Sequence, residues 1–92
     1  MSFNKEVWLP YIHFTMQTIA LNYPKHPNDV TKKKYYDFIQ NLPLLIPMNP
    51  FGDDFIKLID NYPVTPYLDS RLSFMKWVNY IFNKIYNVFI NS

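Results

Sequence analysis

The stretch from Pro43 to Gly52 is built like a reactive centre. Three prolines and the chain's only glycine mark a junction between two helices, because proline lacks a backbone N–H and disfavours helix in the residue before it. A helix that begins here presents unpaired N–H groups and a partial positive charge, which is a favourable place for a reactive side chain. The side chains available are Met48 and Phe51, which carry no acid–base or nucleophilic chemistry. The stretch therefore has the backbone features of an active centre but no side chain that could react.

Other chemistry is limited by composition. The chain has no cysteine, which excludes disulfides, thiolate catalysis and cysteine metal sites, and its two histidines, His13 and His26, do not predict a metal site. Lys32–Lys34 followed by Tyr35 and Tyr36 resembles a basic and aromatic nucleic-acid patch. A solvated helix face is the simpler interpretation of these lysines, and the net charge of +2 is too small to imply nucleic acid by itself.

At 92 residues the chain is expected to form a single domain, residues 1–92. Hydrophobic residues make up 49% and aromatic residues 20%, more than a domain of this size can hide. This surplus favours a homodimer or a bound protein partner. No signal peptide is visible, and the longest apolar run, residues 42–48, is too short to span a membrane. We therefore expect a soluble, intracellular protein.

The elements that must position these residues are helices. Apolar residues at helical spacing predict four of them, over residues 7–23, from 29 or 31 to 42, over 50–61, and from a cap at Asp69 or Ser70 to about 89. Asn28 and Asp29 are the predicted cap of the second helix. The apolar positions are Ile12, Met16, Ile19, Ala20 and Tyr23, then Tyr35, Phe38, Ile39 and Leu42, then Phe51, Phe55, Leu58 and Ile59, and finally Met75, Val78, Phe82, Ile85 and Phe89. Short loops join the segments, which predicts an all-α four-helix bundle.

An ordered set of residues along these helices resembles the Erv/ALR family of FAD-linked sulfhydryl oxidases. The set is Trp8, Pro10, Thr18-Ile19-Ala20, Tyr23-Pro24, Pro27, Lys33, Tyr35, Phe38-Ile39, Leu42-Pro43, Pro47, Ser70-Arg71, Trp77-Val78 and Asn83. The resemblance implies a four-helix bundle with a short fifth helix, usually dimeric, that holds FAD at its mouth. In the family, a Cys-x-x-Cys at the start of the third helix passes electrons from dithiols to the flavin and on to oxygen.

The chain departs from this pattern where the family does its chemistry. The two family cysteines fall at Met48 and Phe51, and neither side chain can form the thiolate that attacks a disulfide or faces the flavin. The further departures are Leu9 for a glycine, Gln17 for a histidine, Phe82 for a histidine and Tyr86 for an asparagine. The chain therefore cannot be a sulfhydryl oxidase by the family mechanism.

FAD is the cofactor that the resemblance implies, and the bulkier Leu9, Phe82 and Tyr86 lead us to expect that its site is lost. The residues that the resemblance places toward a flavin are Trp8, His13, Gln17, Trp77, Asn83 and Lys84. Two of them have open alternatives. Trp77 could stack on an adenine or pack in the core, and Asn83 could bond a flavin or a backbone carbonyl.

Three functions are consistent with these residues. The first is a non-catalytic member of the oxidase fold, acting as a dimeric structural or protein-binding module that pairs through its first two helices. Family members of this kind are typical of large DNA viruses, which implies a viral factory or virion as its place. The second is a flavin-binding redox protein that relies on the thiols of a partner. The third, a nucleic-acid-binding helical module using Lys32–Lys34, is the least expected.

Overall fold

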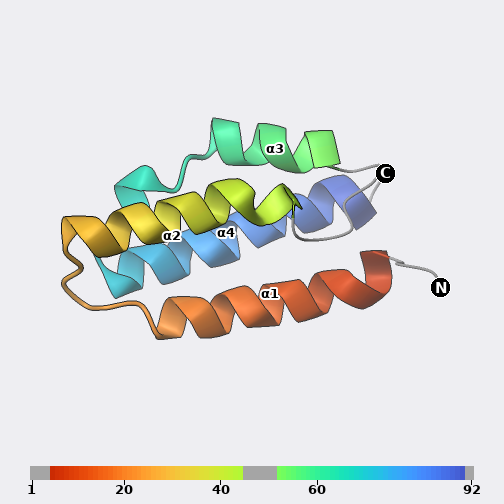
Figure 1. Ribbon diagram of the computed structural model, residues 1–92. Coiled ribbons are helices and arrows are strands. Elements are labelled where there is room, and N and C mark those ends of the chain that lie inside the picture. Colours follow the sequence, from red (N-terminus) through yellow and green to blue (C-terminus); the bar gives the residue numbers. More distant parts are fainter. Residues whose placement is uncertain (1–4, 45–51, 91–92) are drawn as a thin grey trace.

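The computed structural model describes residues 5–44 and 52–90, and over these residues the chain is all-helical. The helices are α1 (Lys5–Leu21), α2 (Asp29–Asn41), α3 (Gly52–Asn61) and α4 (Arg71–Ile90), with two short 3-10 helices at Leu42–Leu44 and Thr65–Tyr67 (Figure 1). No strand and no fifth α-helix occurs within these ranges. The predicted all-α architecture of four helices is confirmed.

Consecutive helices run in opposite directions, as in an up-and-down bundle. In Figure 1, α1 and α4 lie side by side and antiparallel, α3 lies on the other side of α4, and α2 lies in front of α4. The helix α4 thus lies between α1 and α3, and its side chains reach both.

Both predicted helix caps are confirmed. The side chain of Asn28 accepts a hydrogen bond from the backbone N of Thr31 at 2.8 Å. The hydroxyl of Ser70 accepts one from the backbone N of Ser73 at 3.1 Å. Each cap satisfies an N–H group that the first turn of a helix leaves without an internal partner.

The ends of α1 differ from the prediction of residues 7–23. The helix begins at Lys5, so Pro10 lies in its second turn, and it ends at Leu21. Pro24 disfavours the helical conformation in Tyr23, which explains the early end. Tyr23 is nevertheless fully buried, at 0% exposed, because it folds back into the core from the loop.

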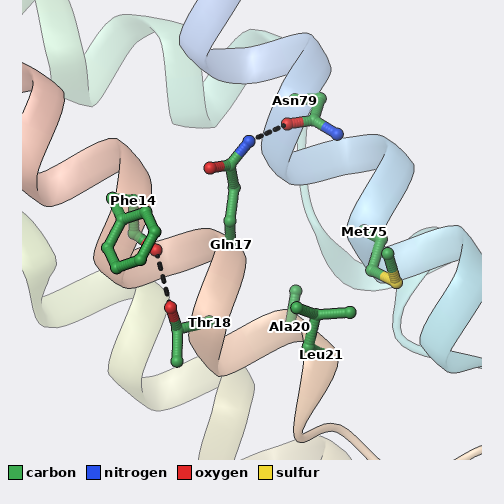
Figure 2. Close-up of a pocket in the computed structure, with 7 residues that line it drawn as sticks. All are labelled: Phe14, Gln17, Thr18, Ala20, Leu21, Met75 and Asn79. Carbon is green, nitrogen blue, oxygen red and sulfur yellow. Dashed lines mark hydrogen bonds between the residues drawn. The ribbon is translucent and has the colours of Figure 1, made fainter.

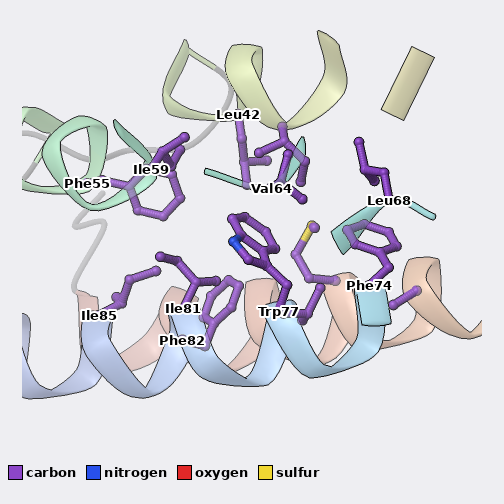
Figure 3. Close-up of a cluster of buried hydrophobic side chains, with 14 of the residues drawn as sticks. Leu42, Phe55, Ile59, Val64, Leu68, Phe74, Trp77, Ile81, Phe82 and Ile85 are labelled. Carbon is purple, nitrogen blue, oxygen red and sulfur yellow. The ribbon is translucent and has the colours of Figure 1, made fainter. Parts of the chain in front are cut away.

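The core lies along α4, whose buried side chains meet those of the segments opposite (Figure 3). Its buried members are Leu9, Met16, Ala20, Tyr23, Ile39, Leu42, Phe55, Ile59, Val64, Leu68, Phe74, Trp77, Val78, Ile81, Phe82 and Ile85. Six predicted core positions are only partly buried at its edge: Ile12, Ile19, Tyr35, Phe38, Leu58 and Met75. Phe51 and the side chain of Phe89 lie outside the described residues.

Tyr23 joins three segments at one end of the bundle. Its hydroxyl donates to the backbone carbonyl of Leu68 at 2.5 Å, and its own carbonyl accepts from Nε of Arg71 at 2.6 Å. Its ring meets those of Tyr35 and Phe74 edge to face, with centroids 4.6 and 5.0 Å apart. The end of α1, the loop before α4 and the first turn of α4 are thereby held together.

Candidate functional site

Two of the six residues expected to face a flavin, His13 and Gln17, meet on the side of α4 that faces α1. Nε2 of Gln17 donates to Oδ1 of Asn79 at 3.0 Å, and Nε2 of His13 lies 3.4 Å from the same oxygen. The imidazole of His13 stacks on Phe82, with ring centroids 4.7 Å apart and planes inclined by 2°, and Tyr86 lies against it at 5.7 Å. Asn79 therefore organises this cluster, although the sequence analysis did not single it out.

Two others, Trp77 and Lys84, meet on the opposite side of α4, where Tyr62 follows α3. The indole N–H of Trp77 donates to the carbonyl of Tyr62 at 2.8 Å, and the Trp77 ring is 2% exposed. Nζ of Lys84 lies 5.5 Å from the centroid of the Tyr62 ring and 5.3 Å from that of Tyr80. The two aromatic rings attract the ammonium through a cation–π interaction.

The remaining expected residues are Asn83 and Trp8. Asn83 is exposed, so it needs neither a flavin nor a backbone carbonyl as a buried partner. Trp8 is partly buried against the edge of the core. Met48 and Phe51, the positions of the family cysteines, lie outside the described residues. The structure thus divides the expected flavin residues between two sides of α4.

The described side chains, as they lie, do not fit a bound flavin. A flavin ring system needs open aromatic faces to stack on, with donors and acceptors free to bond it. One face of the His13 ring is covered by Phe82, and Trp77 is enclosed in the core with its N–H group already bonded to Tyr62. The oxygen of Asn79 accepts from Gln17. These residues stabilise the bundle itself.

Two of the three lysines in the run are paired with carboxylates. Nζ of Lys32 lies 2.9 Å from a carboxylate oxygen of Asp69, and Nζ of Lys33 lies 2.7 Å from one of Asp37. These pairs lower the positive charge that the run could offer to a phosphate backbone, and Lys34 is exposed. Within residues 5–44 and 52–90, no three or more His, Cys, Asp or Glu side chains gather in a way that could hold a metal ion.

Comparison with known proteins agrees with the resemblance in the sequence. The chain is 28% identical over 81 residues to R368 of Acanthamoeba polyphaga mimivirus, a protein named as a probable FAD-linked sulfhydryl oxidase. The match covers 87% of this chain but 57% of the relative, so the chain spans little more than half of that protein's length. No protein-family model matches the chain, and no solved structure matches it.

The comparison therefore relates the chain to a sulfhydryl oxidase at low identity. Among the described helices, none is both long and apolar enough to cross a membrane.

Proposed function

We propose that this protein is a non-catalytic relative of the FAD-linked sulfhydryl oxidases that acts as a dimeric structural or protein-binding module. One observation carries the proposal: a chain similar to such an oxidase over 81 residues contains no cysteine. Thiol oxidation on this fold requires a thiolate to attack a disulfide and a second thiolate beside the flavin. Neither step can take place on this chain.

Loss of the flavin is part of the same proposal. The stack of His13 on Phe82 and the enclosed ring of Trp77 support it, because both groups already have protein partners. A flavin would have to displace these contacts and would gain no free donor at Trp77. The bundle is held together by its aromatic core instead.

The flavin absorption spectrum of the purified protein, recorded before and after incubation with FAD and gel filtration, tests this part. We expect no flavin band in either sample. Consumption of oxygen in the presence of dithiothreitol should equal that of buffer alone, because no protein thiol can relay electrons. A bound flavin that survives gel filtration would overturn the non-catalytic proposal and favour a redox protein that uses the thiols of a partner.

The outer face of α1 supports dimerisation. Three of its large apolar side chains, Val7, Tyr11 and Phe14, are 61%, 72% and 68% exposed and follow one another at steps of four and three residues. No Asp, Glu, Lys or Arg occurs between Val7 and Pro24. A helix without charges on its outer face is typical of one that is covered on that side. A second copy can cover it without like-charge repulsion.

Light scattering during size-exclusion chromatography tests the dimer. We expect the mass of two chains for the natural sequence and of one chain for Tyr11→Glu, which places a charge in the middle of the seam. The matched control is Ile56→Glu on α3, where the natural residue is 45% exposed and lies outside the face. A natural chain that remains a monomer at high concentration would contradict dimerisation.

The mimivirus relative supports a place for the protein in a virus particle or in the site of its assembly. Mass spectrometry of purified virions is the direct measurement. We expect the chain in the particle at a structural copy number, and its absence from both particle and assembly site would remove this part of the proposal.

A further inference from the structure

A groove runs between the last two turns of α1 and the first two turns of α4. It consists of two adjoining hollows of about 300 and 410 Å³, which share Met75. Figure 2 shows the first, where Leu21 of α1 and Met75 of α4 stand on either side of the gap. The second continues past Leu72 to the loop that holds Lys25. From Leu72 to Asn79 the wall is about 10 Å long, which corresponds to two helical turns.

The middle of the groove is apolar and has room for a side chain. Ala20, at its floor, is 0% exposed and carries only a methyl group. The walls are Leu21 and Leu72, 59% and 62% exposed, with Met75 between them. The hydroxyl of Thr18 donates to the carbonyl of Phe14 at 3.0 Å, so its hydrogen is already used within α1. This part of the groove therefore offers an apolar surface for packing and leaves no hydroxyl hydrogen to bond a ligand.

The two ends of the groove differ in chemistry. At one end the hydrogen bond between Gln17 and Asn79 joins the two helices and closes the gap (Figure 2). At the other end stand two cations, Lys25 and Arg71. Arg71 is oriented by the hydrogen bond from its Nε to the carbonyl of Tyr23. Among the described side chains, neither cation forms an ion pair with a carboxylate. The groove therefore combines an apolar trough with an unneutralised positive end.

We propose that this groove binds an amphipathic α-helix of another protein. An apolar anchor of that helix, such as leucine, lies over Ala20 between Leu21 and Met75, and an aspartate or glutamate about two turns away faces Lys25 and Arg71. The inference rests on the protein-binding role proposed above and names the chemistry of the partner.

Charge complementarity favours a different protein over a second copy of this chain. The α1 helix of a second copy could supply apolar anchors, but its one carboxylate, Glu6 in the first turn, already interacts within its own chain and is not free to face the two cations. The face suggested for the dimer is centred on Val7 and Tyr11 and meets the groove only at Phe14, which lines the end closed by Gln17 and Asn79. A partner helix and a second copy can therefore occupy different parts of the same helix.

The probe is a synthetic helical peptide with capped ends, with leucines at positions i, i+4 and i+7 and two glutamates beyond them. Its twin carries lysines in place of the glutamates. Backbone amide shifts of the isotope-labelled protein report the site during titration. We expect saturable shifts confined to residues 17–25 and 70–79. The acidic peptide should bind about tenfold more tightly than its twin at low ionic strength, with the ratio shrinking as salt is added.

Four single variants separate the two parts of the site. Leu72→Glu should weaken binding of the acidic peptide at least about tenfold, because it adds a like charge to the apolar wall. Lys25→Glu should weaken it about fivefold and improve binding of the lysine twin. The matched controls are Ile56→Glu and Lys57→Glu on α3, both at exposed positions outside the groove, which should leave binding unchanged.

Three results would overturn the inference: no saturable binding at millimolar peptide, equal binding of both peptides, or shifts that lie elsewhere. Loss of self-association in Leu72→Glu but not in Ile56→Glu would assign the groove to a second copy instead. A flavin on the purified protein would overturn the proposed function without moving the peptide shifts. The two failures are thus distinguishable.

Discussion

The imidazole ring of His13 lies flat on the phenyl ring of Phe82, with centroids 4.7 Å apart and planes inclined by 2°. The contact joins α1 to α4 across 69 positions of the sequence, and Phe82 is 1% exposed. Because the ring of Phe82 also packs in the core, one side chain fills the interior and supports the surface cluster around Asn79.

Phe82→Ala should lower the free energy of unfolding by about 3–5 kcal/mol, since it leaves a large cavity and removes the support of His13. Urea unfolding followed by circular dichroism measures the change. His13→Ala is the matched variant from the other side of the stack and should cost no more than about 1.5 kcal/mol. Equal losses in the two variants would show that the stack, and not core packing, is the main contribution.

Tyr23→Phe removes the hydroxyl that bonds the buried carbonyl of Leu68. The carbonyl is then left without its donor, and we expect a loss of about 1–3 kcal/mol of stability at neutral pH. Tyr36→Phe, at a position 37% exposed, is the matched control and should be neutral within about 0.5 kcal/mol. A neutral Tyr23→Phe would mean that the carbonyl finds another donor.

The same residue predicts a loss of stability at high pH. Burial, followed by the neighbouring Tyr35 and Asp69, raises the pKa of Tyr23 above its ordinary value of 10.0. The folded state thus holds this proton more tightly than the unfolded state. The contribution of Tyr23 is complete below pH 10.0 and is lost as the pH rises through 10.0 toward the folded pKa. Stability measured at pH 8 to 11 should fall less steeply in Tyr23→Phe than in the natural chain, and Tyr36→Phe should keep the natural slope.

Most of the fold could be predicted from the sequence, because the patterns that define its helices and caps are local in the chain. Helical spacing of apolar residues places all four helices, and the caps at Asn28 and Ser70 act within one turn of the side chain that makes them. The early end of α1 was missed because the apolar Tyr23 continues the helical spacing. It is buried from the loop, where Pro24 has already ended the helix.

The sequence did not predict the two clusters on either side of α4, one around Asn79 and one around Tyr62. Asn79 and Tyr62 carry no sequence signal of their own, and each acquires its role from residues that are distant along the chain. For Trp77, the sequence pattern favoured neither packing in the core nor stacking on the ring of a cofactor. Its buried ring and its bond to the carbonyl of Tyr62 account for it within the bundle.

Trp77→Phe tests that account of Trp77. The phenyl ring keeps most of the buried area but cannot donate to the carbonyl of Tyr62, so we expect a loss of about 1–3 kcal/mol in urea unfolding. The cation–π contact of Lys84 offers a comparison on the same side of α4, and Lys84→Gln should cost less than about 1 kcal/mol. A Trp77→Phe variant as stable as the natural chain would leave the indole N–H without a structural role.

The double variant Met48→Cys with Phe51→Cys restores the two cysteines at the positions that the resemblance assigns to them. If the start of the third helix keeps the family arrangement, the two sulfurs lie within bonding reach and oxidation should form a disulfide without loss of the fold. Mass spectrometry after alkylation counts the free thiols, and circular dichroism follows the helices. The single variants are the controls, since each has one thiol and can form only an intermolecular disulfide. Two free thiols after treatment with oxidant, in a chain that remains helical, would show that these positions do not correspond to the family cysteines.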